Sequence, residues 1–350
     1  MKIQMYYAIQ RVIRTLHRWH LFFQKNDGST NYRSIAVLCG AGIGDAVMAT
    51  PIIEAIKLYD NNIEITVVAN NLNAEIFKFN PYISRRIVYK KEPFSLIKSY
   101  ISILRIKCDV FIGSQPSNTI IHYLYAFFSF AKHKIKIDKA ELVVKYRNYD
   151  FLYNTLIRDN KKRHRVDLNL EIVKNIGVFN PALEEIVCKI HVPQLYILKH
   201  PYYYTWRAKY IVIHIGGGRK QKIWQIDNYS KIVEYLLEKD VIVIIVGGIE
   251  EQHFAAKINI DNPKRIINLI GRLNLNEVSL LLRQSELLIT NDSGIMHLAT
   301  TTNVKIIALF GDTTPSHIGP YTNRSIVIKK DHVKDISVEE VMILIDRCLK

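Results

Sequence analysis

The sequence predicts an α/β protein made of two doubly wound parallel-sheet domains. Three observations predict this fold class. The chain has 350 residues, which is too long for one small core and suits two domains of roughly 150 residues each. Short apolar runs typical of buried strands alternate with segments of helical periodicity. Both halves open alike, with a strand, a glycine turn and then a helix, so we expect two lobes with a cleft between the carboxyl ends of their strands.

The first half begins with a βαβ pattern. "SIAVLCG" at 34–40 reads as a buried strand, a helix is expected from about residue 47 to 59, and "IEITVVA" at 63–69 is a second strand. This order, within about 35 residues, is typical of a parallel sheet. Further strands are expected at 86–89 and 108–113, and a buried helix at 120–131.

The second half repeats the alternation of strands and helices. Periodicity is lost between about 185 and 210, a stretch with Pro193 and Pro201, where we place the interdomain connection. The elements expected after it are strands at 210–218, 241–248, 286–290 and 305–311 and helices at 228–239 and 274–284. The predicted organisation is an N-terminal basic amphipathic helix (1–30), a first domain (31–190), a linker (191–209), a second domain (210–335) and a C-terminal helix (336–350).

The N-terminal segment 1–25 carries an apolar stripe at helical spacing, with arginines and lysine on the opposite face. A basic amphipathic helix of this kind can lie in an anionic membrane surface, or it can pack against its own domain. No apolar run approaches the ~20 residues of a membrane span. The segment also lacks the apolar core of a signal peptide, so we expect a cytoplasmic protein.

The formal net charge is +16, from 48 Lys and Arg against 32 Asp and Glu. This charge favours an acidic partner such as nucleic acid, anionic lipid or a phosphorylated substrate. No nucleic-acid-binding motif is present, and four widely spaced cysteines indicate a reducing compartment rather than a metal site. Basic clusters gather in the first half, where they suggest an anionic acceptor or are simply surface lysines: Arg85, Arg86, Lys90, Lys91, 132–139 and 161–165.

Two stretches of the second half predict phosphate binding. "NDSG" at 291–294 falls between a predicted strand and a helix, where free backbone N–H groups attract phosphate; Asp292 or Ser293 could instead be an ordinary N-cap. His297 follows on the same helix face and, taken alone, is more often structural. "HIGGGRKQKIW" at 214–224 places three glycines before basic residues that could neutralise a diphosphate or form a solvated face.

A third stretch, "CGAGIGDAVMATP" at 39–51, resembles a dinucleotide fingerprint only weakly, because Asp45 stands where the last glycine should be. A carboxylate at the start of a helix would repel phosphate there. It suits a general base that takes a proton from a substrate hydroxyl. The alternative for Asp45 is an N-cap.

These stretches, in their order and spacing, resemble the glycosyltransferase family 9 lipopolysaccharide heptosyltransferases, inverting enzymes of the GT-B fold with two Rossmann-like domains. The resemblance covers about 35–321 and rests on "GDAVMATPIIEAIK", "HIGGGRKQKIW", "GGIEEQ", "NDSGIMHLA" and "ALFGDTTPSHIGPY". It implies that the first domain binds the acceptor and the second the nucleotide-sugar donor. Departures occur at Gln225, Thr300 to Thr302 and Asp312, and they bear on donor identity.

The resemblance also implies roles for matching residues. Asp45 would be the base and Lys222 would contact the donor phosphates, with no metal and no cofactor. The remaining donor-binding residues would be Gly216, Gly217, Gly247, Glu251, Asp292, Ser293, Gly294 and His297. Gly44 and Thr50 from the first motif, with Arg85 and Arg86 from the basic clusters, would bind the acceptor.

The expected reaction is heptose transfer from ADP-heptose to the lipopolysaccharide inner core or a related surface glycan. It would take place in the cytoplasm or peripherally on the cytoplasmic face of the inner membrane, reached through residues 1–25. Two alternatives stay open. One is a GT-B transferase or epimerase for another nucleotide sugar, and the other is a non-catalytic glycan-binding protein.

Overall fold

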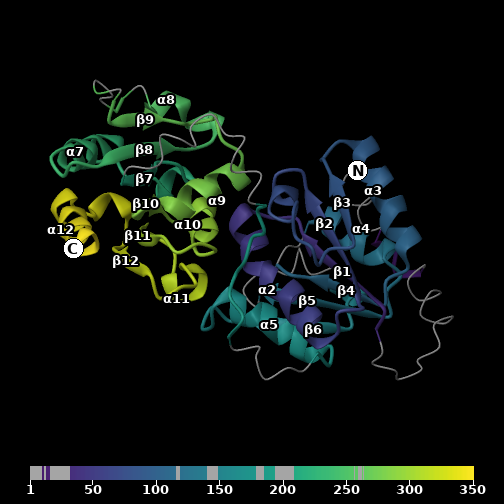
Figure 1. Cartoon of the computed structure of the whole chain (residues 1–350). Helices are drawn as coiled ribbons and strands as arrows, with labels where there is room; N and C mark the ends of the chain where they lie inside the picture. Colours follow the sequence, from purple (N-terminus) through teal and green to yellow (C-terminus); the bar gives the residue numbers. More distant parts are fainter. Residues whose placement is uncertain are drawn as a thin grey trace. The chain divides into compact units, whose positions relative to one another are not determined.

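The computed structural model forms two compact units, residues 1–186 and 187–350, each with one six-stranded parallel sheet (Figure 1). Two doubly wound sheets confirm the predicted fold class. The described residues are 10–11, 13–15, 32–115, 119–139, 149–178, 185–193, 209–255, 257–258, 262 and 264–350. Most of the linker predicted for 191–209 lies outside the described residues. The boundary between the two units falls between residues 186 and 187.

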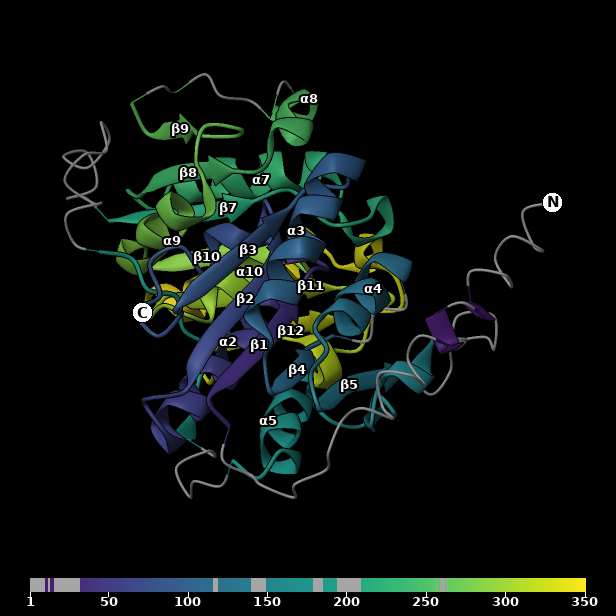
Figure 2. The ribbon, with the colours of Figure 1, turned by 90° about the vertical axis from the view of Figure 1, so that its right-hand side faces the viewer.

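The sheet of unit 1 has the order β3-β2-β1-β4-β5-β6. Its strands are β1 (Ser34–Cys39), β2 (Glu64–Asn70), β3 (Arg85–Tyr89), β4 (Val110–Gly113), β5 (His133–Lys139) and β6 (Thr155–Asp159). The helices are α2 (Ile43–Tyr59), α3 (Pro93–Ile106), α4 (Ile120–Phe128) and α5 (Arg165–Asn175), with short 3-10 turns η1 (Asn73–Glu75) and η3 (Asp150–Leu152). The α3–α4 pair covers one face of the sheet, and the α2–α5 pair covers the other (Figure 2).

The sheet of unit 2 has the order β12-β11-β10-β7-β8-β9. Its strands are β7 (Tyr210–His214), β8 (Ile242–Val246), β9 (Ile266–Asn268), β10 (Leu287–Asn291), β11 (Lys305–Phe310) and β12 (Ser325–Lys329). The longer helices are α7 (Ile226–Leu237), α9 (Leu275–Gln284) and α12 (Val338–Leu349). The shorter ones are α8 (Gln252–Ala255), α10 (Gly294–Ala299) and α11 (Pro315–Ile318), with 3-10 turns η6 (Lys220–Lys222), η7 (Ile249–Glu251) and η8 (Val333–Asp335).

Strand order decides where a site can form. In unit 1 the order reverses between β1 and β4, and in unit 2 between β7 and β10. At such a switch point the loops after the two strands diverge and leave a crevice at the carboxyl edge of the sheet. The glycine turn at 40–44 follows β1, while the "HIGGG" and "NDSG" stretches follow β7 and β10. All three stretches that were predicted to carry chemistry therefore lie at switch points.

One predicted basic cluster is wrong. The segment 132–139 is largely strand β5, and both Lys134 and Lys136 are buried in the unit. Lys136 Nζ pairs with Asp150 at 2.5 Å and donates to Tyr123 Oη at 3.0 Å, so its charge is compensated internally. Burial lowers the pKa of Lys134 to about 8. Lys134 and Lys136 are therefore part of the core and do not offer a charge to an acceptor at the surface, whereas Lys132 before the strand is exposed.

The described part of the N-terminal segment packs on unit 1. Residues 10–11 and 13–15 are helical, and Ile13 is buried in a cluster with Tyr123, Phe127, Tyr149 and Leu152. The guanidinium of Arg14 lies 4.9 Å from the ring centre of Phe151. For this turn the structure bears out packing against the chain's own domain, while the rest of 1–25 lies outside the described residues. Among the described helices, none combines the length and apolar character that a membrane crossing needs.

Candidate functional site

Asn291 at the end of β10 ties the two loops of unit 2 together. Its Oδ1 accepts from the backbone N–H of Trp224 at 3.1 Å and from Tyr229 Oη at 2.9 Å, and its Nδ2 donates to the Gly216 carbonyl at 2.9 Å. The indole of Trp224 in turn donates to the Ile336 carbonyl at 2.9 Å. A buried amide bonded at both ends fixes the path of the 215–224 loop across the switch point.

Beneath this loop lies a buried polar cluster of His214, Thr290 and Ser293. Nδ1 of His214 is 3.1 Å from Thr290 Oγ1 and 3.2 Å from Ser293 Oγ, and the two hydroxyls are 3.1 Å apart. Ser293 Oγ also accepts from the backbone N–H of Met296, which makes Ser293 the N-cap of α10. Its hydroxyl is therefore engaged within the fold. Burial lowers the pKa of His214 to about 4.

This pKa shift predicts a loss of stability in acid. Between about pH 4 and 6.5 unfolded His214 binds a proton that folded His214 does not, so stability falls as the pH falls. We expect His214 to contribute about 2 kcal/mol less to the free energy of unfolding at about pH 5 than at about pH 7.5. Denaturant titrations at both pH values measure the free energy of unfolding. In His214→Gln this free energy should fall less between the higher and the lower pH than it does in the wild type. An equal loss in both proteins would contradict the prediction. Burial also lowers the pKa of His122, so this residue adds to the acid sensitivity of both proteins. The diagnostic quantity is therefore the difference between wild type and His214→Gln in how much stability each loses.

Gly216 and Glu251 meet at the same edge of the sheet. A Cβ on Gly216 would lie 2.6 Å from Glu251 Oε1 and 3.0 Å from His214 Nε2, so a larger residue would displace the Glu251 carboxylate. Glu251 is buried, its Oε2 accepts from the backbone N–H of Gly248 at 2.5 Å, and Gly247 lies against its side chain. Burial, with Glu250 beside it, raises the pKa of Glu251. The structure thus brings three predicted donor-binding residues together.

Lys222 and Asp292 form an ion pair at this edge. Thr313, which follows β11, donates to the same Asp292 oxygen at 2.6 Å. Since an ammonium group has three N–H donors, one bond to Asp292 leaves Lys222 able to contact a phosphate as well. Gly217 packs against Ile223 in the same loop. Gly294 begins α10, and His297 is buried within it.

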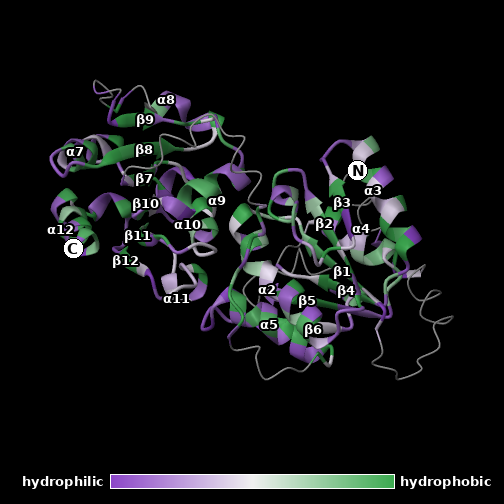
Figure 3. Cartoon of the chain, viewed as in Figure 1, coloured by the Kyte–Doolittle hydropathy of each residue, from purple (hydrophilic) through white to green (hydrophobic). Residues whose placement is uncertain are grey.

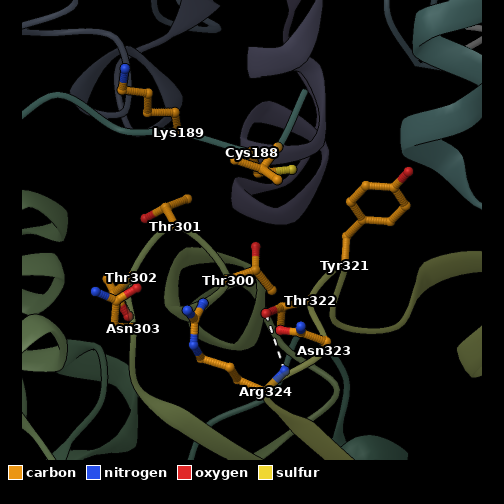
Figure 4. A pocket seen from close by; sticks show the side chains of 11 residues that line it. Cys188, Lys189, Thr300, Thr301, Thr302, Asn303, Tyr321, Thr322, Asn323 and Arg324 are labelled. Carbon is orange, nitrogen blue, oxygen red and sulfur yellow. Dashed lines mark hydrogen bonds between the residues drawn. The ribbon is translucent and has the colours of Figure 1, made fainter. Parts of the chain in front are cut away.

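A pocket of unit 2 lies at the other edge of the sheet from this ion pair (Figure 4). Its volume is 530 Å³, and its lining includes Lys189, Thr300 to Thr302 and Arg324. These threonines precede β11 and Arg324 precedes β12, which places the pocket at the amino edge of the sheet, away from Lys222 and Asp292. Each threonine hydroxyl donates to the carbonyl three residues before it. The departures at Thr300 to Thr302 are therefore accommodated outside the candidate site.

In unit 1 Asp45 lies in the first turn of α2, directly after β1 and its glycine turn. The helix begins at Ile43, earlier than the sequence indicated. Asp45 Oδ2 accepts from the backbone N–H of Gly42 at 3.2 Å, which is a capping contact, and the side chain is 32% exposed. The cap and a chemical role are compatible, because the carboxylate remains open to solvent.

Arg165 is a further member of this site. Its guanidinium lies 2.8 Å from Asp159 Oδ2 and 4.0 Å from Asp45 Oδ1, and both Arg165 and Asp159 are buried. One buried cation thus lies beside two carboxylates, those of Asp159 and Asp45. The sequence assigned Arg165 to a surface cluster at 161–165, and the structure corrects this, because Arg165 is the first residue of α5 and faces inward.

Thr50 and Pro51 have a structural explanation. Pro51 lies inside α2 and has no N–H to give to the Val47 carbonyl. The Thr50 hydroxyl donates to that carbonyl at 2.8 Å and satisfies it. Thr50 is buried, whereas Gly44 lies in the first turn beside Asp45. Acceptor binding by Gly44 and Thr50 stays a prediction.

Arg85 and Arg86 are not brought to Asp45 by the fold. They are exposed and open β3, whose last residue, Tyr89, pairs with Asn70 at the carboxyl end of β2. Four residues of extended strand separate Arg85 from that end, or about 13 Å. Tyr89 Oη instead lies 3.4 Å from the Gly40 carbonyl and 3.1 Å from His122 Nε2. Both arginines lie at the opposite end of the strand from the glycine turn.

Comparison with known proteins identifies a family. A family model described as glycosyltransferase family 9 (heptosyltransferase) matches residues 126–344. Lipooligosaccharide heptosyltransferase 2 of Campylobacter jejuni is 26% identical over 296 residues, 81% of this chain and 83% of that protein. The Haemophilus influenzae protein of the same name is 31% identical over 112 residues, so the matched stretch spans about a third of each protein (31% and 32%).

A solved structure shows the same fold. The Escherichia coli protein described as ADP-heptose lps heptosyltransferase II superposes with a TM-score of 0.75 at 18% identity, covering 90% of this chain and 98% of that one. At 18% identity this similarity shows the fold alone. The fold is GT-B, as the sequence predicted.

Proposed function

Because the chain belongs to glycosyltransferase family 9, we propose that it transfers a heptose from ADP-heptose to a hydroxyl of the lipopolysaccharide inner core or a related surface glycan. The E. coli protein, an ADP-heptose lps heptosyltransferase, carries this donor and this acceptor class in its name. We propose further that the reaction inverts the anomeric centre, needs no metal or cofactor, and takes place on the cytoplasmic side of the inner membrane.

The observation that carries this proposal is the position of Lys222. It lies on the loop after β7, at the switch point of unit 2, and is held there by Asp292. A fixed cation at the carboxyl edge of a doubly wound sheet suits the diphosphate of a nucleotide sugar. As ADP leaves, Lys222 would stabilise the negative charge that develops on the leaving oxygen of the diphosphate. In other active sites a metal ion provides this stabilisation.

Asp45 supplies the other half of the chemistry. Its carboxylate would take the proton of the acceptor hydroxyl as that oxygen attacks the anomeric carbon. The bond from this carbon to the diphosphate oxygen breaks in the same displacement, and a single displacement inverts the centre. Arg165 would act as a positioning residue that orients the Asp45 carboxylate through their ion pair. The first turn of α2 fixes the carboxylate through Gly42.

The test is incubation with ADP-heptose and truncated lipopolysaccharide acceptors, read by mass spectrometry. We expect an acceptor product heavier by one heptose unit, and we expect it also in the presence of EDTA. Product formed from UDP- or GDP-sugars but not from ADP-heptose would favour another nucleotide-sugar enzyme of the same fold. Neither transfer nor donor hydrolysis with any sugar, despite glycan binding, would indicate a non-catalytic protein. Loss of activity in EDTA that Mg²⁺ restores would overturn metal independence.

A further inference from the structure

Helix α3 of unit 1 exposes an apolar face. Its exposed side chains include Phe94 (82% exposed), Ile97 (57%), Ile101 (43%) and Leu104 (40%). The spacing of three, four and three residues puts all four on one side of the helix, along about 15 Å of its length. Figure 3 shows that hydrophobic residues recur along α3 among hydrophilic ones, and the four named here are those that point outward, where a surface helix normally presents polar groups. Single exposed apolar residues are ordinary, but a row of four is not.

The opposite side of α3 is firmly attached to the unit. Ile103 is buried in the core beneath the helix, and Ser99 Oγ lies 2.6 Å from Tyr125 Oη of α4. Tyr100 packs on Tyr125 with ring centres 4.7 Å apart. The exposed row is therefore a second face of a helix whose core-facing side is already packed.

Cations flank this row on one side and at both ends. The exposed basic residues from the start of the α3 loop to the end of the helix are Lys90, Lys91, Lys98, Arg105 and Lys107. Glu92 is the one acidic residue in the same stretch, 90–107. Lys98 and Arg105 lie on the helix flank next to Phe94 and Ile101. The surface thus combines an apolar strip with a strong excess of positive charge.

We propose that this face of α3 docks the chain on an anionic lipid bilayer. Apolar side chains of an interfacial helix enter the boundary between headgroups and acyl chains, and each nearby Lys or Arg adds about 1 kcal/mol of attraction to an anionic surface. Five cations against one anion match lipid phosphates better than a second copy of this basic chain. Membrane docking rests on the proposed function in one respect: a lipid-linked acceptor lies in a membrane, so an enzyme that uses it must bind there.

Vesicle flotation with the full-length chain tests the proposal. We expect binding to vesicles of phosphatidylglycerol and phosphatidylethanolamine, weakening with salt, and little binding to phosphatidylcholine alone. The variant Phe94→Ser/Ile97→Ser/Ile101→Ser should bind at least ~10-fold more weakly, and Lys98→Glu/Arg105→Glu should lose the preference for anionic lipid. The control is Ile343→Ser, which removes an apolar residue of comparable exposure (66%) from α12 of unit 2 and should bind like wild type.

Several outcomes would overturn the proposal. Unchanged binding of the triple serine variant would place docking elsewhere, for example in residues 1–25. An equal loss in Ile343→Ser would show that the effect is not specific to α3. A dimer in sedimentation that the triple variant abolishes, with vesicle binding intact, would assign the face to self-association. Because flotation needs no sugar donor or acceptor, its result is independent of whether the proposed transfer occurs, and the triple variant should keep wild-type turnover on a water-soluble acceptor.

Discussion

Replacing Asp45 by Asn is expected to lower kcat for sugar transfer by at least about 100-fold while leaving affinity for ADP nearly unchanged. General-base catalysis contributes on the order of 100- to 10,000-fold, and an amide cannot take up the acceptor proton. Asp45→Ala should abolish transfer, since it removes both the base and the contact with Gly42. Turnover is measured by product mass over time, and ADP affinity by calorimetry.

The amide variant separates catalysis from helix capping. Asn at position 45 keeps a carbonyl oxygen that can accept from the Gly42 N–H, so the free energy of unfolding should change by less than about 1 kcal/mol. Asp60→Asn, at the other end of α2, is the matched control and should turn over normally. Wild-type turnover in Asp45→Asn would remove Asp45 from the role of base. An inactive variant that is also unfolded would show the cap, not the chemistry, to be limiting.

The sequence allowed the sheets to be predicted where strands consist mainly of apolar residues. β7, "YIVIH", and β10, "LLITN", are buried along their whole length, as strands of a parallel sheet covered on both faces should be. β5 failed this test because Lys134 and Lys136 interrupt it with charge. Local pattern cannot show that Asp150, fourteen residues after Lys136, returns to neutralise that lysine.

The candidate site divides in the same way. The glycine turns after two predicted strands identified the loops at Gly40 and Gly216 as candidate site loops. That prediction needs only local sequence, because glycine turns at the carboxyl ends of parallel strands are common ligand-binding positions. Partners distant in sequence were missed. Asn291 holds the Trp224 loop, and Arg165 approaches Asp45 from 120 positions away. His214 and Thr313 both lie within motifs that the sequence offered, "HIGGGRKQKIW" and "ALFGDTTPSHIGPY". Their contacts with Ser293 and Asp292 depend on strand order, which local spacing does not show.

Removing the Lys222 charge is expected to weaken donor binding most. A charge-assisted hydrogen bond contributes about 1.5–3 kcal/mol, so Lys222→Ala should weaken ADP-sugar affinity by roughly 10- to 150-fold and also lower kcat, because the same contact grows stronger as ADP departs. Lys220→Ala is the matched control, since Lys220 is an exposed cation of the same 3-10 turn. Fluorescent ADP displacement and steady-state kinetics would measure both quantities.

The ion pair complicates that result, because losing Lys222 also leaves the buried Asp292 without its cation. Such an uncompensated buried carboxylate costs several kcal/mol of stability, and it would repel a diphosphate by its own charge. The double variant Lys222→Ala/Asp292→Asn removes both charges and keeps an oxygen that can accept from Thr313. If Lys222 contacts phosphate, the double variant recovers stability but not donor affinity or kcat. If Lys222 only neutralises Asp292, the double variant recovers all three, and the diphosphate must then be held by the backbone N–H groups of the glycine loop.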